Sequence, residues 1–179
     1  MEFQAIMDKL TERPSQHPDC CCSISINVLD TLIRHLPKSP AQVLSCGAGT
    51  GLLERLILER SGQQVNIYGI EVPSCVNKYL SEERMLRVRS TTDLHSDALL
   101  AEVLIFCYPR QETLLLQKYL QAFVSGTLHT AIVLTHYDDH LPAKAILMIF
   151  FDRVDVVQNS GLPDFEKLIV ATQVKSGER

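Results

Sequence analysis

Three glycines at a fixed spacing follow an apolar run in the first third of the chain. Residues 42–53 read QVLSCGAGTGLL, so Gly47, Gly49 and Gly51 occupy every second position. The apolar run before the glycines and the helical pattern after them predict a strand, a tight turn and a helix. Glycine is needed where the backbone turns sharply and approaches a ligand, because a Cβ would block that approach. The helix would point its free N–H groups toward the same place.

An acidic residue ends the next apolar run. Residues 65–70, VNIYGI, are followed by Glu71, which stands twenty residues after Gly51. A carboxylate at the tip of a second strand can accept hydrogen bonds from the hydroxyls of a ribose. The glycines and Glu71 together therefore predict a nucleoside-containing cofactor.

The densest group of ionisable side chains follows the apolar run 130–135. It reads His136, Tyr137, Asp138, Asp139 and His140. A histidine with a pKa near neutrality suits the removal of a proton from a hydroxyl or a thiol, so His136 and His140 are candidate catalytic bases. Two other interpretations stay open: the group could bind a divalent metal, or it could be a solvated loop in which Asp139 caps a helix that starts at Leu141.

Tyr108 is a further candidate for the reaction site. It follows the continuous apolar run 103–107, VLIFC, which is typical of a central strand covered on both faces. In open α/β sheets ligands bind at the carboxyl ends of the strands. We therefore expect the Tyr108 hydroxyl to orient a substrate.

The chain has six cysteines, and three of them are consecutive. They are Cys20, Cys21, Cys22, Cys46, Cys75 and Cys107. Adjacent cysteines do not easily make a compact disulfide framework, so free, partly buried thiols in a reducing compartment are expected. The triplet lacks the C-x-x-C spacing of a zinc site and a matching second half, and we predict no metal there.

Length and charge narrow the class of protein. A chain of 179 residues with 46% apolar residues is typical of one domain with a core. It has no apolar run of membrane-spanning length, and its start lacks the features of a signal peptide, so a cytoplasmic protein without membrane contact is expected. The net charge of −4 argues against a nucleic acid partner. The arginines at 84, 87 and 89 then read as a solvated strand edge, and a homodimer is left open.

The elements that must position these residues alternate along the chain. Besides the run before Gly47, strands are expected at 65–70, 85–89, 103–107 and 130–135. Helices are expected at 25–36, after Gly51, from Pro73 to Leu80, at 112–123 and from 141 to 150. The last two strands, 153–158 and 167–174, are joined too briefly for a crossover helix and should be antiparallel.

The first 24 residues are expected to be a separate N-terminal segment before a domain at 25–179. A short helix fits residues 3–10, and residues 13–18, RPSQHP, should break any regular structure. Such a segment would either cover the cofactor pocket or be a loose end.

Taken in order, these features resemble the class I S-adenosylmethionine-dependent methyltransferase family. The resemblance is carried by residues 43–51, VLSCGAGTG, by Glu71 and by the closing hairpin, and it covers residues 26–174. It implies an α/β, Rossmann-like fold: a seven-stranded, mostly parallel sheet with helices on both faces and a C-terminal antiparallel β-hairpin. It also implies S-adenosylmethionine as cofactor and methyl transfer to an oxygen, nitrogen or sulfur atom of a small molecule.

The same resemblance implies a set of cofactor-binding residues. They are Gly47, Ala48, Gly49, Gly51, Glu71, Val72, Thr92, Asp93 and Cys107. Glu71 would hold the ribose hydroxyls, Val72 would touch the adenine, and the residues after the third strand would lie beside the adenine. Cys107 and Tyr108 would line the place where the methyl group is presented.

Two other functions were weighed against this one. A nicotinamide-dependent oxidoreductase should carry G-x-G-x-x-G, and this chain has Leu52 where the third glycine would be. A non-catalytic module of the same fold, which binds S-adenosylmethionine or a partner, is the stronger alternative. Cys107 stands where the branches that methylate adenine or glutamine amides have an acid or amide. The catechol-type enzymes need an acid at the end of the fourth strand, and its absence argues against a metal.

Overall fold

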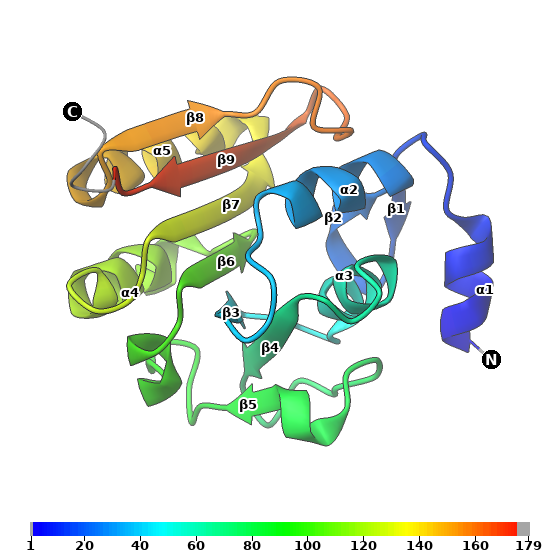
Figure 1. The fold of residues 1–179 in the computed structure, drawn as a ribbon, viewed down its shortest axis with the longest axis horizontal. Helices are drawn as coiled ribbons and strands as arrows, with labels where there is room; N and C mark the ends of the chain where they lie inside the picture. Colours follow the sequence, from blue (N-terminus) through cyan, green and yellow to red (C-terminus); the bar gives the residue numbers. More distant parts are fainter. Residues whose placement is uncertain (1, 175–179) are drawn as a thin grey trace.

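Seven strands form one sheet in the computed structural model, which describes residues 2–174. From one edge to the other the order is β5, β4, β3, β6, β7, β9 and β8 (Figure 1). Their bounds are β3 Gln42–Cys46, β4 Asn66–Glu71, β5 Met85–Arg87, β6 Val103–Cys107, β7 Thr130–His136, β8 Arg153–Val156 and β9 Glu166–Thr172. The strands from β5 to β7 pair in parallel, and β9 is antiparallel to both β7 and β8.

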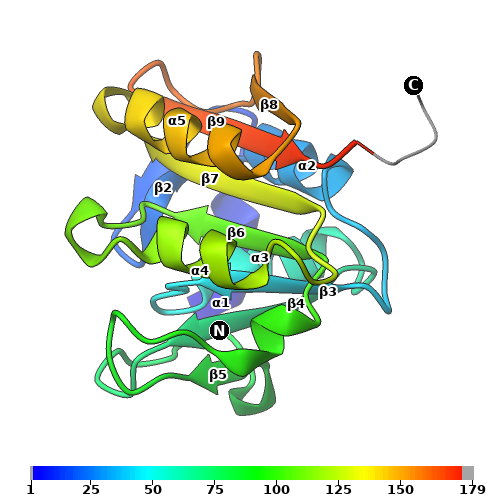
Figure 2. The same cartoon turned by 90° about the vertical axis from the view of Figure 1, so that its left-hand side faces the viewer.

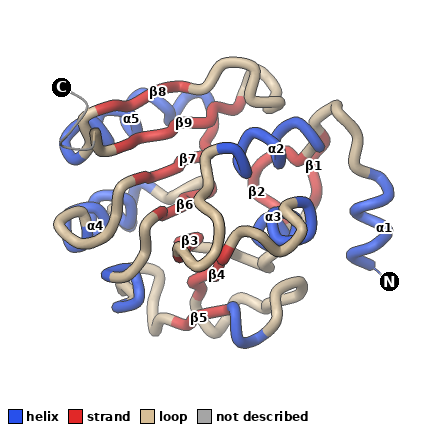
Figure 3. Tube along the Cα trace, viewed as in Figure 1, coloured by secondary structure: helices blue, strands red, loops and turns tan. Residues whose placement is uncertain are grey.

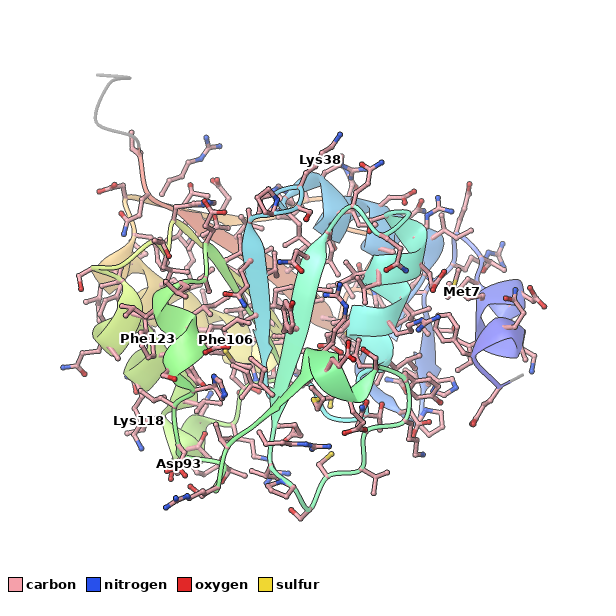
Figure 4. All side chains as sticks on the ribbon, turned by 60° about the horizontal axis from the view of Figure 1, so that its bottom comes forward. Met7, Lys38, Asp93, Phe106, Lys118 and Phe123 are labelled. Atoms are coloured by element: carbon pink, nitrogen blue, oxygen red, sulfur yellow. The ribbon has the colours of Figure 1, made fainter. Side chains whose placement is uncertain are left out.

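Helices cover both faces of this sheet. On one face lie α2 (Ile26–Arg34) and α3 (Leu52–Arg60), and on the other lie α4 (Leu115–Phe123) and α5 (His140–Phe150) (Figure 2). Figure 4 places Phe106 and Phe123 on the α4 side and Met7 on the opposite side. The side chains of β6 are buried, as the continuous apolar run predicted. The predicted fold class, including the closing antiparallel hairpin, is confirmed.

The order of the strands reverses between β3 and β6. From β3 the chain moves outward to β4 and β5, returns to β6 beside β3, and then moves outward the other way to β7. Loops that leave two such strands at their carboxyl ends diverge to opposite faces, which leaves a crevice between them. The glycine loop after β3 and Tyr108 after β6 lie at this point.

The predicted helix from Pro73 to Leu80 is wrong. Residues 72–81 are described throughout and form a loop, drawn in tan in Figure 3, before a 3-10 turn at Glu82–Arg84. The Asn77 side chain receives a hydrogen bond from the Leu80 N–H at 3.1 Å and donates one to the Leu80 carbonyl at 2.8 Å. These bonds replace those of a helix. Val76, expected to face inward, is 67% exposed.

The N-terminal segment is more regular than predicted. It contains α1 (Glu2–Lys9) and an antiparallel hairpin of β1 (Ser15–His17) and β2 (Cys20–Ile24). The prediction that residues 13–18 break all regular structure is therefore wrong for β1, since pairing with β2 supplies an order that the local sequence does not predict.

The turn of this hairpin docks on the glycine loop. The Thr50 hydroxyl donates to the Asp19 carbonyl at 2.8 Å, and the Tyr79 hydroxyl donates to the Asp19 carboxylate at 2.6 Å. Lys78 pairs with the same carboxylate at 2.9 Å. Tyr79 and Lys78 hold the pKa of Asp19 below its usual value.

Two predicted elements begin or end differently. The helix expected from 112 begins at Leu115, after a 3-10 turn at Gln111–Thr113, because Leu114 has a left-handed backbone with φ of 53°. The strand expected to reach 89 ends at Arg87. Both differences lie next to the crevice at the strand ends.

Candidate functional site

A cavity of about 370 Å³ opens at the carboxyl ends of β3, β4 and β6. Its lining comes from the glycine loop, the loops after β4 and β5, the segment after β6, the start of α4 and the N-terminal hairpin. Its lining residues include Cys21, Cys46, Gly47, Gly49, Glu71, Val72, Cys75, Asp93, Cys107, Tyr108, Arg110 and Tyr119. The crevice expected from the strand order is therefore a real cavity.

The glycine loop gives this cavity an open floor. Gly47, Gly49 and Gly51 have left-handed backbones with φ of +80°, +60° and +81°. A Cβ built on Gly47 or Gly49 would meet nothing within 4 Å, so each would project into free space. At Gly51, which does not line the cavity, a Cβ would lie 3.0 Å from the Leu80 side chain. Two of the glycines thus leave room for a ligand, and the third permits packing.

Glu71 stands at the edge of the same floor. One of its carboxylate oxygens accepts a hydrogen bond from the Gly49 N–H and the other from the Val72 N–H, both at 2.8 Å. A carboxylate has about four lone-pair positions. The two N–H groups fix its orientation and leave acceptor capacity for hydroxyl groups of a ligand.

The far end of the cavity is apolar and aromatic. Val88, Leu115 and Tyr119 line it together with the turn that contains Asp93. The Tyr119 hydroxyl accepts a hydrogen bond from the His95 N–H at 3.1 Å, and the Ser90 N–H donates to the Asp93 carboxylate at 3.1 Å. Figure 4 shows Asp93 on the same side of the sheet as α4. A flat, partly polar group such as a base would fit here.

Several solved structures with a similar fold are methyltransferases. A scan of protein-family models and a search of the curated proteins match nothing. Among solved structures, a SAM-dependent methyltransferase from Aquifex aeolicus aligns with 82% of this chain and 89% of its own, at a TM-score of 0.61 and 14% identity. A precorrin-6y C5,15-methyltransferase from Geobacter metallireducens aligns with 93% of this chain and 95% of its own, at 0.61 and 11%.

A third relative was solved with the cofactor. It is a 16S rRNA methyltransferase from T. thermophilus in complex with AdoMet and guanosine. It aligns with 93% of this chain at a TM-score of 0.55 and 14% identity, and this chain spans 47% of its length. The chain has the class I S-adenosylmethionine-dependent methyltransferase fold. At these identities the likeness concerns the fold, and the acceptors of the relatives differ widely.

The residues of this methyltransferase fold suit S-adenosylmethionine. Gly47 and Gly49 leave the free space that a ligand backbone needs, and Glu71 offers oxygens for ribose hydroxyls. Val72, Asp93 and Cys107 line the cavity as well, whereas Ala48, Gly51 and Thr92 are not among its lining residues. Six of the nine cofactor-binding residues implied by the resemblance are thus brought together around one space.

Tyr108 lines the cavity, but its hydroxyl is engaged elsewhere. It donates a hydrogen bond to the buried Glu166 carboxylate at 2.7 Å, and that carboxylate also accepts from the Ser23 N–H at 3.1 Å. Burial and the bond to Glu166 raise the pKa of Tyr108. The hydroxyl therefore stays protonated and can offer a substrate only its acceptor side. The backbone at Tyr108 is left-handed, with φ of 53°.

The two histidines of the segment 136–140 do not line this cavity. His136 Nδ1 accepts from the Asp138 N–H at 3.2 Å, and His140 Nδ1 contacts the Tyr137 carbonyl. Neither ring is among the lining residues of the cavity. Asp139 holds the N-cap position of α5, and its carboxylate accepts a hydrogen bond from Gln111 at 3.1 Å. Within the described part of the chain, no group of three or more His, Cys, Asp or Glu residues is arranged to hold a metal ion.

A second cavity of about 190 Å³ adjoins the first. Pro109, Arg110 and Leu115 line both, and the second is completed by apolar residues of α4 and α5 with Asp139. Sequence reasoning missed it because its walls come from two helices and a strained segment. The only local signal was the Pro109-Arg110 pair, which interrupts the apolar pattern just after β6.

Glu54 is the other feature that sequence reasoning missed. It lies on the first turn of α3 and is 1% exposed, and its Oε1 accepts a hydrogen bond from the Ser45 hydroxyl. Its Oε2 has no hydrogen-bond partner among the described residues. Burial raises the pKa of Glu54 to about 7. Ser45, a polar residue inside an apolar strand, was the available signal that a polar partner would be buried against it.

Proposed function

We propose that the protein binds S-adenosylmethionine in the larger cavity and transfers its methyl group to a small molecule. The observation that carries this proposal is the pairing of the open floor over Gly47 and Gly49 with a Glu71 carboxylate held at its rim by the Gly49 N–H. We further propose that residues 1–24 wall one side of the site, since Cys21 of the N-terminal hairpin lines the cavity.

The cofactor would supply an electrophilic methyl group on a sulfonium, so the protein mainly binds and orients the reactants. Glu71 would bind ribose hydroxyls, and the apolar surface of Val88 and Leu115 would exclude water around the base. The Tyr108 hydroxyl would accept a hydrogen bond from the molecule that receives the methyl group, because the hydroxyl already donates its own hydrogen bond to Glu166. A nucleophile that is already deprotonated, or that loses its proton to water, fits this site best.

The second cavity is the proposed position of the acceptor. It meets the cofactor cavity at Pro109, Arg110 and Leu115, directly after the β6 end. A space of about 190 Å³ suits a molecule of roughly the size of a substituted aromatic ring. Arg110 would attract an anionic group of that molecule.

A nucleic acid acceptor is the less favoured form of this proposal, although rRNA and tRNA methyltransferases are among the structural relatives. Two of the three clustered arginines are committed to backbone carbonyls. Arg84 donates to the Ile67 carbonyl at 3.0 Å, and Arg87 donates to the Val72 carbonyl at 3.0 Å. These contacts leave Arg89 as the exposed member, which is too little for a phosphate-binding surface.

A non-catalytic module that binds S-adenosylmethionine is the second candidate function. It is favoured by one observation: two ionisable groups near the β6 end, Tyr108 and Glu166, are bonded to each other. A third candidate, an NAD(P)-dependent enzyme, ranks behind both, because Leu52 is packed in the core where that fingerprint needs glycine.

The test has two steps. Isothermal calorimetry with S-adenosylmethionine, S-adenosylhomocysteine and NAD should show binding of the first two alone, and binding of NAD alone would sink the proposal. The protein is then incubated with S-adenosylmethionine and a pool of small phenols, carboxylic acids and amines. S-Adenosylhomocysteine production that depends on the pool supports the enzyme, and binding without any turnover supports the module.

No helix within the described residues is both long and apolar enough to cross a membrane.

All six cysteines lie within the described part of the chain, and each is a free thiol. Because disulfides persist in oxidising compartments and thiols in reducing ones, we propose that the protein works in the cytoplasm.

A further inference from the structure

All six cysteines of the chain meet at one end of the sheet. Cys21, Cys46, Cys75 and Cys107 line the larger cavity, although they come from four different segments. Cys20 and Cys22 lie beside Cys21 on β2 and pack in the same core cluster as Cys107. The proposed methyl transfer gives these thiols no role, so their convergence needs a separate explanation.

Three of the thiols lie in one core cluster. The sulfur atoms of Cys20 and Cys22 are 3.7 Å apart, and Cys107 packs against the same cluster. Cys20 is partly exposed, whereas Cys22 is fully buried. Cys107 borders the cavity, so a small reagent can reach the group from two sides. Within the described residues, no group of three or more His, Cys, Asp or Glu side chains is placed to hold a metal ion, and these three sulfurs are no exception.

The three thiols are not equivalent in acidity. Hydrogen bonds from Cys107 and Cys22 lower the pKa of Cys20 well below its usual value. The same interactions raise the pKa of Cys22, and the bond to Cys20 raises the pKa of Cys107. Cys20 is therefore the most readily deprotonated of the three thiols. A partly exposed thiolate beside a second thiol is the arrangement that peroxides oxidise selectively.

We propose that Cys20 and Cys107 form an oxidation site for hydroperoxides, at which a disulfide between them shuts the cofactor cavity. In the first step the Cys20 thiolate attacks the peroxide, which gives a sulfenic acid and releases the other oxygen as hydroxide or alkoxide. In the second step the Cys107 sulfur displaces the sulfenic hydroxyl, which takes the proton of the Cys107 thiol and leaves as water, while the hydroxide or alkoxide of the first step takes its proton from solvent. Overall two thiols and one hydroperoxide give one disulfide, one alcohol or water, and one further water.

Cys107 is a better partner for Cys20 than the nearer Cys22. Cys20 and Cys22 are two positions apart on the same strand, so their Cα atoms are separated by about 6.7 Å at the usual rise of a strand. That separation is at the upper end of the range that a disulfide spans without strain, about 4.4 to 6.8 Å. Cys107 belongs to a different strand, β6, so the rise along one strand does not fix its separation from Cys20.

The bond would change the cavity because it would tie the N-terminal hairpin to the end of β6. Cys20 precedes Cys21, which lines the cavity from the hairpin, and Cys107 lines it from the end of β6. A disulfide brings sulfurs to about 2.0 Å, much nearer than thiols in contact. We therefore expect the hairpin to be drawn toward β6 and the space between them to narrow. This effect on binding rests on the proposed function, but formation of the disulfide does not.

The experiment treats the full chain with one equivalent of hydrogen peroxide and digests it with trypsin without reduction. Cleavage leaves Cys20, Cys21 and Cys22 together in residues 10–34, because Arg13 precedes a proline, and leaves Cys107 in residues 90–110. A covalent link between these two peptides is the expected product. A link confined to residues 10–34, or no link, overturns the proposal.

Matched variants assign the partner within the triplet. Cys20→Ser and Cys107→Ala should each abolish the link, whereas Cys22→Ala, Cys21→Ser and Cys75→Ser should retain it. Loss of the link in Cys22→Ala alone would overturn the pairing. Circular dichroism of each variant identifies one that does not fold, and the remaining member of the Cys20 and Cys107 pair then decides.

Calorimetry with S-adenosylhomocysteine separates this inference from the proposed function. We expect the affinity for this ligand to fall at least roughly tenfold after oxidation. Reduction with dithiothreitol should restore it. If the reduced protein does not bind this ligand, the proposed function fails while the peptide link still tests the site. If oxidised and reduced protein bind equally, the oxidation site stands but the shutting of the cavity is wrong.

Discussion

Two loops of this protein occupy equivalent places and do different things. The glycine loop 47–51 follows the buried strand β3, and the loop 136–140 follows the buried strand β7. The first presents bare backbone to a cavity, with nothing within 4 Å of where a Cβ on Gly47 or Gly49 would lie. The second folds its side chains back, since His136 and His140 both bond to nearby backbone.

The difference shows that a position at the carboxyl edge of the sheet is necessary for a site and not sufficient. Both loops carry residues capable of chemistry. Only the loop at the reversal of strand order opens into the crevice, because there the flanking loops diverge. In loop 136–140 the side chains instead bond to nearby backbone, since His136 accepts from the Asp138 N–H.

The largest effect is expected from Gly49→Val. The variant places a branched side chain in the ligand space at a backbone with φ of +60°. Affinity for S-adenosylmethionine should fall at least roughly a thousandfold, about 4 kcal/mol, as measured by calorimetry. Gly62→Val is the matched control, since Gly62 has the same φ of +60° and equal free space but lies outside the cavity lining. The Gly62→Val variant should be less stable and should bind S-adenosylmethionine as the natural protein does. Loss of binding in both variants would mean that backbone strain, and not blockage of the cavity, weakens binding.

The next effect concerns the helix that the glycine loop starts. Glu54 has an ordinary pKa of 4.5 in the unfolded chain and about 7 in the fold. Between these values the unfolded chain releases its proton while the folded protein retains it, so the free energy of unfolding falls as pH rises from 4.5 to about 7. The fall should be about 3 kcal/mol at most.

Glu54→Gln keeps an oxygen for the Ser45 hydroxyl and cannot ionise. Urea unfolding at several pH values should therefore show that the variant lacks this decline and exceeds the natural protein in stability at pH 8. Glu83→Gln, at an exposed position, serves as the control and should follow the natural protein. A natural protein whose stability stays level across this pH range would contradict the assignment to Glu54.

Glu71→Gln should have a moderate effect. The amide retains one acceptor oxygen for the Gly49 N–H, but it loses the charge that strengthens bonds from ribose hydroxyls. Affinity for S-adenosylhomocysteine should fall about tenfold, or about 1.4 kcal/mol. Adenine alone should bind both proteins equally, and a comparable loss for adenine would remove Glu71 from the ribose position.

The smallest effect on binding is expected from His136→Ala. The variant removes the acceptor of the Asp138 N–H, which should cost about 0.5 to 1 kcal/mol of stability and leave cofactor affinity unchanged. Turnover is the informative measurement, because His136 is also a candidate base. Slower turnover at unchanged cofactor affinity would mean that His136 takes part in the reaction. The two loops would then both contribute to the site, and the contrast between them would be wrong.

Local sequence patterns predicted much of the sheet because each strand is specified by its own residues. The bounds of β6 match the apolar run 103–107. The strand β9, Glu166–Thr172, overlaps the strand predicted at 167–174. The helix predicted from Pro73 failed because Asn77 bonds locally to Leu80. The strand β1 was missed because its order depends on pairing with β2, which no local pattern reveals.

The sequence by itself determined the end of the cavity that is formed by the glycine loop and Glu71. Glycine spacing, the acid after the second strand and the antiparallel ending are properties of short segments, and each survives as a feature of the fold. Backbone freedom at a turn and a carboxylate at a strand tip are decided by residue type and position alone.

Only the tertiary structure decided what stands around that end. It brought four cysteines from segments between residues 21 and 107 to one cavity, bonded Tyr108 to Glu166, and left His136 outside the cavity lining. These outcomes depend on β6 lying beside β3 and on the hairpin docking over both. Which residues become neighbours depends on the order of the strands in the whole sheet. The spacing of residues along the chain does not predict that order.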